Sequence, residues 1–553
     1  AMGTELIKQG YPLSRCLETA NREQPELVGQ IHARYVAAGA NIISTNTFGA
    51  NRFRLREHGI ADQVVDLVHR GTALAKRAAG GRALVALSVG PSGVPVGADQ
   101  ETAFQDLVEG FREQIKAGSQ AGADLISLET MTDIQELRAA VVAAREVCDL
   151  PIMAQLTFDG HLHTLSGTPA ATAAAILSGL DLDLIGANCS EGPEQLVEAL
   201  KLMADVSSLP LIVQPNAGVP ILNGAGQPAY PVTPEMMADA VPAFIRLGAR
   251  VIGSCCGSDP TYTRAIAAVS RSVNPLPPIP CSCDGLLASQ THHLTIGHQA
   301  PPILISERFS AFYRSDIHQA LIHGERLPLM DEAVEQRSAG ARAINISVSA
   351  PGLVERPAME MAIAIVQQTA ALPLSIQSND PMTMELALQV ARGRPLLNAV
   401  RATEQDMGSM LPMARRYGAM AIVIPQDEDE HDHGLRKLLS NAQKVVESAM
   451  RLGLRRQDLI VDCLAGFAAA SPQALDETLR LSELVHEELG LCTLFGVSGA
   501  STGRRQRALL NAAYAAMAIH AGADALIGNP LQRELVSSVL AAGELMGRRR
   551  GSP

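Results

Sequence analysis

One short pattern of apolar and polar positions recurs along the 553-residue chain. A helix-like stretch ends in Gly-Ala, and an uninterrupted apolar run follows within a residue or two. The Gly-Ala pairs of its copies lie at residues 39–40, 122–123, 248–249, 340–341, 418–419 and 522–523. We expect each glycine to end its helix in the left-handed conformation, which glycine adopts at least cost. Each apolar run predicts a strand buried on both faces, as in a parallel sheet.

A helix followed by a buried strand, repeated along a chain, is typical of α/β proteins. The Pro-rich segment 273–302 shows no period, and we interpret it as a linker. It separates residues 1–272 from residues 303–553, and each part has the size of one (β/α)8 barrel, about 250 residues. The sequence therefore predicts an α/β fold with two (β/α)8 TIM barrels in tandem, although the spacing alone leaves a doubly wound sheet open.

Composition and charge remove several classes of function. The formal net charge is −12, aromatic residues make up 3% and Trp is absent, so we expect no nucleic-acid partner. We find no long apolar run and no secretory signal, so we expect no membrane span and a cytoplasmic protein. Nine cysteines are too sparse for a disulfide scaffold, so clustered cysteines indicate metal ligands or catalytic groups.

Three cysteines end two predicted strands of the first half. Cys189 ends one strand, and Cys255 and Cys256 end another. In barrels the reactive side chains gather at the carboxyl ends of the strands, so the three thiols can meet on one rim. Three thiolates with an open fourth position suit a catalytic zinc ion, which would hold a substrate thiol as a nucleophilic thiolate for alkyl transfer. The alternative is that each cysteine is a small buried apolar residue.

The sequence around these cysteines resembles a known family. The matching stretches are AMGTEL (1–6), PELVGQIHARYVAAGANIISTNTFGANR (25–52), SLETMTDIQEL (127–137), GANCSEGP (186–193) and GSCCGSDP (253–260). They resemble the homocysteine S-methyltransferase domain found in cobalamin-dependent methionine synthase and in betaine–homocysteine methyltransferase. The family usually begins with an apolar strand and D-G-A-M-G-T-E-L, whereas this sequence opens inside that motif at Ala1. We therefore expect it to lack the first barrel strand and the Asp that follows.

This resemblance assigns roles to residues of the first half. It implies that Cys189, Cys255 and Cys256 bind zinc and that Glu129 faces the amino group of homocysteine. It further implies that Met2, Asn46 and Thr47 help to hold the amino-acid end of that substrate.

The second half resembles, more weakly, the pterin-binding barrel that follows the homocysteine barrel in cobalamin-dependent methionine synthase. Stretches that fit include LISERFS (304–310), AVEQRSAGARAINISVS (333–349) and residues 495–530. The resemblance implies that the pterin-binding residues are Glu307, Asn398, Asp462 and Arg507. The family has Asp, Asn, Asp and Asn where this sequence has, in turn, Asn345, Ser347, Gln377 and Gly499. Each lost buried hydrogen-bond partner costs about 1–3 kcal/mol, so we expect weak binding of 5-methyltetrahydrofolate by an intact barrel.

These resemblances predict an enzyme similar to methionine synthase, a homocysteine S-methyltransferase that forms methionine in methionine biosynthesis. We recognise no cobalamin-binding segment, so we expect methylcobalamin to be supplied in trans, on a separate corrinoid protein. Two alternatives stay open. The methyl donor could be another, non-folate compound, or the second barrel could be a non-catalytic docking module for a corrinoid protein.

Overall fold

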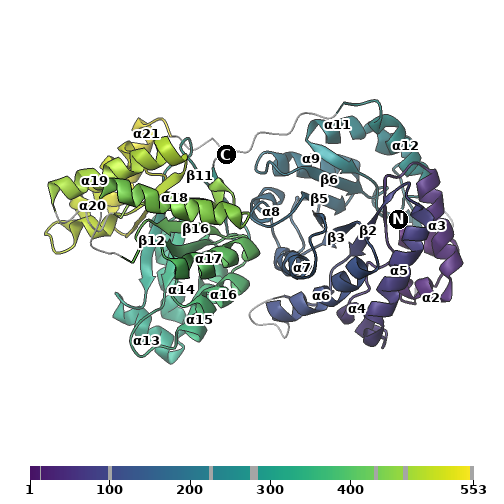
Figure 1. The fold of residues 1–553 in the computed structure, drawn as a ribbon, viewed down its shortest axis with the longest axis horizontal. Helices are drawn as coiled ribbons and strands as arrows, with labels where there is room; N and C mark the ends of the chain where they lie inside the picture. Colours follow the sequence, from purple (N-terminus) through teal and green to yellow (C-terminus); the bar gives the residue numbers. More distant parts are fainter. Residues whose placement is uncertain are drawn as a thin grey trace. The chain divides into compact units, whose positions relative to one another are not determined.

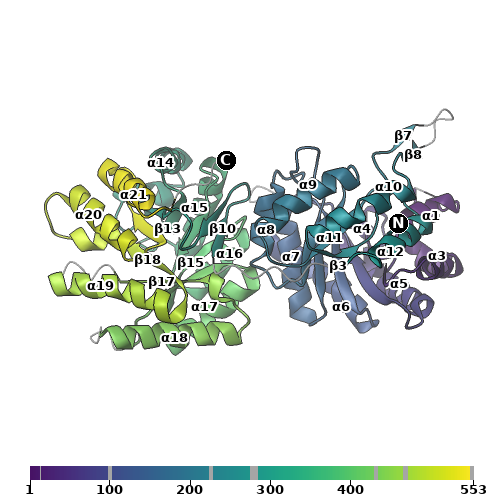
Figure 2. The same cartoon turned by 90° about the horizontal axis from the view of Figure 1, so that it is seen from above.

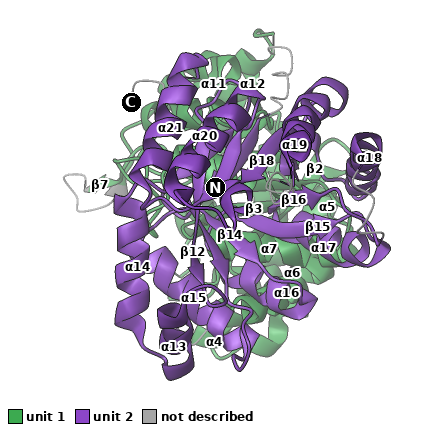
Figure 3. Ribbon diagram, turned by 90° about the vertical axis from the view of Figure 1, so that its left-hand side faces the viewer, with its two compact units in different colours: residues 1–280 green, residues 281–553 purple. Residues whose placement is uncertain are grey.

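The computed structural model describes residues 1–12, 14–96, 103–222, 228–274, 284–428, 434–464 and 471–548. The chain forms two compact units, Ala1–Pro280 and Cys281–Pro553, which Figure 3 draws in two colours. Both units consist of a parallel sheet whose strands alternate with helices, which confirms the predicted α/β fold and the tandem barrels. In the described ranges, no helix combines the length and the apolar character needed to cross a membrane.

The first unit contains a seven-stranded parallel sheet whose strands lie in chain order (Figure 1). Its strands are β1 (Ile42–Ser44), β2 (Leu84–Val89), β3 (Leu125–Met131), β4 (Ile152–Leu156), β5 (Leu184–Cys189), β6 (Leu211–Pro215) and β9 (Ala249–Ile252). Its helices are α1 (Met2–Lys8), α2 (Ala20–Glu23), α3 (Pro25–Ala37), α4 (Arg52–Glu57), α5 (Val64–Ala79), α6 (Phe104–Gln120), α7 (Ile134–Val147), α8 (Ala170–Leu177), α9 (Pro193–Ala204), α10 (Pro234–Asp239), α11 (Val241–Arg246) and α12 (Pro260–Ser270). A small hairpin of β7 (Ile221–Leu222) and β8 (Pro228–Ala229) projects near α10 (Figure 2).

This first sheet curls like a barrel but stays open between β1 and β9. These two strands are its edges, and no strand of the described residues pairs with their outer sides. A cavity of about 540 Å³ lies there, lined by residues of β1, β9, α3 and α12. The seven strands therefore keep the order of a (β/α)8 barrel without closing it.

The second unit is a closed barrel of eight parallel strands. They are β12 (Ile303–Ser310), β13 (Ala343–Ser347), β14 (Leu374–Gln377), β15 (Leu396–Arg401), β16 (Met420–Ile424), β17 (Leu459–Asp462), β18 (Cys492–Gly496) and β19 (Ala525–Gly528). The helices are α13 (Ser315–His323), α14 (Arg326–Ser338), α15 (Glu355–Thr369), α16 (Pro381–Val390), α17 (Glu404–Tyr417), α18 (Leu435–Arg451), α19 (Pro472–Leu484), α20 (Arg507–His520) and α21 (Arg533–Leu545). Because β12 pairs with both β13 and β19, no strand of the barrel has a free edge.

Part of the segment predicted as a linker is ordered. Strands β10 (Gly285–Ala288) and β11 (His293–Ile296) form an antiparallel hairpin. Its buried side chains Leu287 and Ile296 pack with residues at the amino ends of the barrel strands, among them Leu396 and Met420. The hairpin therefore covers the amino end of the second barrel. Its strands are only four residues long, too short for an apolar period to stand out in the sequence.

The six glycines of the recurring pattern behave as predicted. Their φ angles are 100° at Gly39, 90° at Gly122, 98° at Gly248, 103° at Gly340, 72° at Gly418 and 104° at Gly522. Each follows a helix and precedes a strand of a parallel sheet. The predicted helix ends are confirmed by these angles. Glycine stands at these positions because a side chain is disfavoured in this left-handed region.

Candidate functional site

The three predicted zinc ligands meet at the carboxyl end of the first sheet. Cys189 is the last residue of β5, and Cys255 and Cys256 follow the end of β9. Sγ of Cys189 lies 3.3 Å from that of Cys255 and 3.8 Å from that of Cys256, and the last two sulfurs are 4.0 Å apart. Sulfur ligands about 2.3 Å from a tetrahedral zinc ion lie about 3.8 Å from one another. The three thiols therefore fit a tetrahedral ion whose fourth position is open.

Electrostatics also favours a cation between these sulfurs. The thiols of Cys189 and Cys256, together with burial, raise the pKa of the Cys255 thiol well above its usual value. Three thiols this close cannot all ionise unless a positive charge compensates them. Cys189 and Cys255 are half-buried and Cys256 is exposed, so the cluster is open to a substrate.

The backbone around the cysteines is fixed by Asn216, a residue that the sequence analysis missed. Its Nδ2 donates to the carbonyl oxygen of Ser190 over 2.7 Å, and its Oδ1 accepts from the amide of Cys256 over 2.9 Å. Asn216 thus ties the loop after β5 to the loop after β9. Cys189 and Ser190 both have left-handed φ angles, 58° and 62°, which is costly for residues with side chains. Asn216 lies in a Gly-punctuated strand end of the sequence, the one signal that could have indicated it.

Glu129 lies near the end of β3, at the same end of the sheet. Its Oε1 accepts a hydrogen bond of 2.6 Å from Oγ of Ser88. Burial raises the pKa of Glu129 to about 6, and the negative charge of Cys256 contributes to the rise. The next residue, Thr130, has a φ of 60° and exchanges two hydrogen bonds with the side chain of Asn188, just before Cys189. This places a carboxylate close to the thiols and links its strand to theirs.

Asn46 and Thr47 use their side chains inside the protein. Nδ2 of Asn46 donates to the carbonyl of Leu17, and Oγ1 of Thr47 donates to the carbonyl of Ser88. Both side chains are buried, so they brace the strand ends after β1 and β2. Met2 packs against the cluster of Leu6 and its neighbours and lines the cavity between β1 and β9.

The predicted pterin-binding residues lie near the carboxyl ends of strands of the second barrel. Glu307 in β12 accepts from Oγ of Ser498, and Nη2 of Arg507 donates to the carbonyl oxygen of Ser498 over 3.3 Å. The structure therefore brings Glu307 and Arg507 together. Asp462 ends β17 and accepts from the amide of Leu464, and burial raises the pKa of Asp462 to about 6.

Three amides on neighbouring strands form a hydrogen-bonded chain. Nδ2 of Asn345 donates to Oε1 of Gln377 over 3.0 Å, and Nδ2 of Asn398 donates to Oδ1 of Asn345 over 3.1 Å. Oγ of Ser375 adds a bond of 2.8 Å to the same Oδ1. Asn345 and Gln377 stand where the resembling family has acids, so here they bind each other and Asn398.

Comparison with known proteins finds a family match for each unit. Residues 1–270 match the homocysteine S-methyltransferase family, and residues 317–529 match the pterin binding enzyme family. The two matches follow one another along the chain, one in each compact unit. The cysteine cluster thus lies in the residues that match the homocysteine S-methyltransferase family, and the amide chain lies in those that match the pterin binding enzyme family.

Curated relatives match almost the whole chain. Over 95% of its length it is 27% identical to the methionine synthase of Mycobacterium leprae and 26% identical to that of Mycobacterium tuberculosis. The matches cover 46% and 47% of those proteins, so the chain spans about half the length of these relatives. A solved structure, the homocysteine methyltransferase MmuM from Escherichia coli in its metallated form, is 28% identical; the match covers 48% of this chain and 93% of that one, with a TM-score of 0.42.

Proposed function

We propose that the homocysteine S-methyltransferase domain, residues 1–272, transfers a methyl group to the thiol of homocysteine and forms methionine, with zinc on Cys189, Cys255 and Cys256. The observation that carries the proposal is the spacing of the three sulfurs, 3.3–4.0 Å, against the edge of about 3.8 Å for a tetrahedral zinc–sulfur site. The site of this reaction is the cytoplasm, where thiols stay reduced.

Zinc bound to these cysteines would keep the sulfur of homocysteine in the thiolate form at neutral pH. The side chains around it bind and orient the substrate. Glu129 attracts its ammonium group, and the hydrogen bond from Ser88 fixes the direction of that carboxylate. Asn216 keeps the two cysteine loops at the right separation. The homocysteine sulfur then attacks the methyl group in line, and the donor leaves with the bonding electron pair.

In this proposal the pterin-binding domain, residues 303–553, interacts with the methyl donor. The donor is a methylcorrinoid carried by a separate protein, and ordinary 5-methyltetrahydrofolate binds weakly. The amide chain of Asn345, Gln377 and Asn398 supports weak folate binding, because these groups already hydrogen-bond to one another. The alternatives are a different methylated compound and a docking module without chemistry of its own.

The test compares the zinc-loaded full chain with a Cys256→Ala variant. We measure methionine formed from homocysteine, with methylcobalamin and 5-methyltetrahydrofolate offered separately and together. The variant is expected to lose one equivalent of zinc and to form methionine only at the background rate. Cys256 is exposed, so circular dichroism should show an unchanged fold.

The matched control is Cys148→Ala in the same domain, whose Sγ donates to the carbonyl oxygen of Ala144. It should keep both the metal and the activity. A folded, zinc-loaded wild-type chain that is inert with every methyl donor would show the proposal to be wrong. So would full activity of Cys256→Ala.

A further inference from the structure

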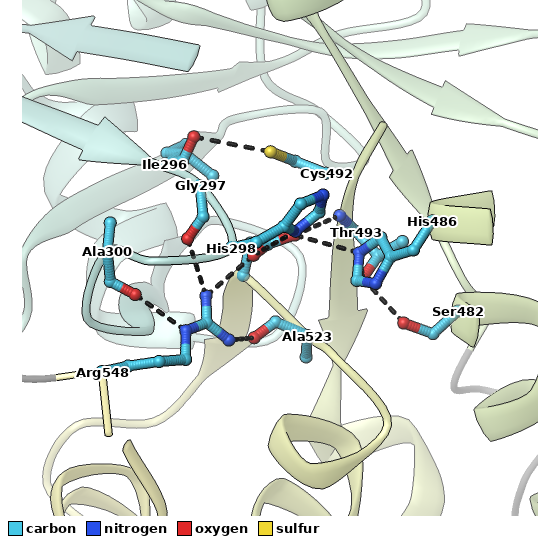
Figure 4. Close-up of polar contacts among 11 residues, drawn as sticks. Ile296, Gly297, His298, Ala300, Ser482, His486, Cys492, Thr493, Ala523 and Arg548 are labelled. Atoms are coloured by element: carbon cyan, nitrogen blue, oxygen red, sulfur yellow. Dashed lines mark hydrogen bonds and ion pairs between the residues drawn. The ribbon is translucent and has the colours of Figure 1, made fainter. Parts of the chain in front are cut away.

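A second cluster of metal-ligand side chains lies at the amino end of the second barrel, opposite to the amide chain. Asp524 directly precedes β19, and His298 lies between β11 and β12. His486 lies in the π-helical turn η5 (Val485–Leu489), ahead of β18. Since β19 pairs with both β18 and β12, the three segments are neighbours. One ligand atom of each residue lies within 4.8 Å of the other two, and Figure 4 shows the two imidazole rings side by side.

The carboxylate of Asp524 is fully buried and held from two sides. Nη2 of Arg548 donates to Oδ1 over 2.7 Å, and the amide of Thr493 donates to Oδ2 over 2.9 Å. A carboxylate offers about four lone-pair positions, so about two of them stay available. The remaining contacts of the carboxylate are with the two histidines, His298 at Oδ1 and His486 at Oδ2.

The distances to the histidines differ from those to the fixed donors. Nδ1 of His298 and Nε2 of His486 each lie 3.3 Å from their carboxylate oxygen. A charge-assisted N–H···O bond usually measures about 2.7–2.9 Å. Nitrogen and oxygen ligands about 2.0–2.1 Å from a tetrahedral zinc ion lie about 3.3 Å apart. Each imidazole nitrogen is therefore at a ligand-to-ligand distance from one carboxylate oxygen, and one ligand atom of each of the three residues lies within 4.8 Å of the others.

The groups behind the ligands hold them in place. Arg548 also donates to the carbonyl oxygens of Gly297, Ala300 and Ala523, so its guanidinium is locked while it orients Asp524 (Figure 4). The ring of His486 packs on Gly522, where an added Cβ would lie 2.4 Å from Cε1. Such supporting contacts are typical of the groups that orient metal ligands.

We propose that His298, His486 and Asp524 bind a first-row divalent transition-metal ion of the zinc class, a choice that suits two imidazoles and one carboxylate. The side chain of His298 is 41% exposed, so an ion can enter from solvent and keep water in the fourth position. The ion would tie the segment between β11 and β12, the turn η5 and the start of β19 together. This site is independent of the cysteine cluster and of the proposed methyl transfer.

The test measures metal bound to the full chain and to His298→Ala. After loading with zinc and removal of the excess, elemental analysis should find one equivalent less in the variant than in the wild type. This difference tests the site whatever the cysteine cluster binds. In a cobalt titration the variant should also lose the weak visible bands of a nitrogen and oxygen site, while any sulfur-to-cobalt charge-transfer band stays unchanged.

His486→Gln is the second variant, and it should weaken cobalt binding at this site at least about tenfold. Mutation of a residue that only supports a metal ligand already lowers metal affinity by about this factor. The control is His323→Ala, an exposed histidine of the same barrel, which should bind as the wild type does. Cobalt should also raise the melting temperature of the wild type more than that of either variant. Equal metal content and an equal thermal shift in the wild type and a folded variant would overturn the proposal.

Discussion

At the carboxyl end of β5 and β9, the first unit presents three thiols with sulfur separations of 3.3–4.0 Å. At the same end of the second barrel, three amides on β13, β14 and β15 hydrogen-bond to one another. Thiols that ionise repel each other, so a cation between them would be favourable, whereas amides carry donors and acceptors and satisfy each other without a ligand. Two related architectures therefore carry different chemistry at the same end, a group of thiols that fits a metal ion in one unit and a self-contained set of amides in the other.

The barrel walls differ as well. The first sheet ends at β1 and β9 with a cavity of about 540 Å³ between them, whereas the second barrel is closed and its amino end is covered by the hairpin β10–β11. Closure removes free strand edges, and the hairpin adds a buried layer at the amino end. We therefore expect the two units to respond separately to changes in their own cores.

The largest effect is expected at a buried ion pair of the second barrel. Breaking this pair tests whether the two units unfold separately. Arg394 and Asp458 are paired with side chains only 1% and 5% exposed. In Asp458→Asn the guanidinium of Arg394 stays buried without its counter-charge, which should lower the free energy of unfolding by about 3–5 kcal/mol. Thermal unfolding should show one transition at a lower temperature, while zinc binding by the cysteine cluster persists.

The control for this prediction is Glu488→Gln, which breaks the exposed pair with Arg436, 80% and 43% exposed. It should change the unfolding free energy by less than about 1 kcal/mol. If Asp458→Asn lowered both transitions equally, the two units would not be independent.

The next effect concerns substrate binding in the first unit. Glu129→Gln removes the negative charge assigned to the ammonium group of homocysteine, which should cost about 1.5–3 kcal/mol of binding and raise KM roughly tenfold to a hundredfold. Since burial raises the pKa of Glu129 to about 6, substrate binding by the wild type should weaken as pH falls below that value. This pH dependence should be absent from KM profiles of the variant.

Stability should move in the opposite direction in the same variant. A carboxyl whose pKa is higher in the folded state binds more protons there, so stability falls as pH rises through the window between its usual pKa and about 6. Glu129→Gln removes that cost and should be more stable at pH 7, on the order of 1 kcal/mol. A variant with unchanged KM would contradict the role given to Glu129.

The smallest effect concerns the amide chain of the second unit. Asn345→Asp restores an acid where the resembling family has one, and it removes the donor that now occupies Gln377. The affinity for 5-methyltetrahydrofolate should rise by about 1–3 kcal/mol in titration calorimetry. Asn345→Ser, which breaks the chain without adding an acid, should bind no better than the wild type. Micromolar binding by the wild type, with turnover of cob(I)alamin, would show that the amides do not weaken folate binding.

Features that depend on residues close together in the sequence could be predicted from the sequence alone. The glycines of the Gly-Ala pattern have the predicted left-handed φ angles, because the end of a helix constrains its local backbone. The apolar runs form parallel strands, as predicted. A strand of a parallel sheet is buried on both faces, so its sequence is an almost uninterrupted apolar run. The convergence of Cys189 with Cys255 and Cys256 also follows from their strand-end positions, because such ends meet on one rim.

Only the tertiary structure decided which polar groups meet across strands. Asn216 joins two loops of the first unit, and Asn345 finds Gln377 and Asn398 on adjacent strands, pairings that no local pattern encodes. His298, His486 and Asp524 come from segments up to 226 residues apart, and barrel closure brings the two histidines to the carboxylate of Asp524. The physical reason is that strand order and closure set these distances, whereas sequence periodicity reports only which face of each element is buried.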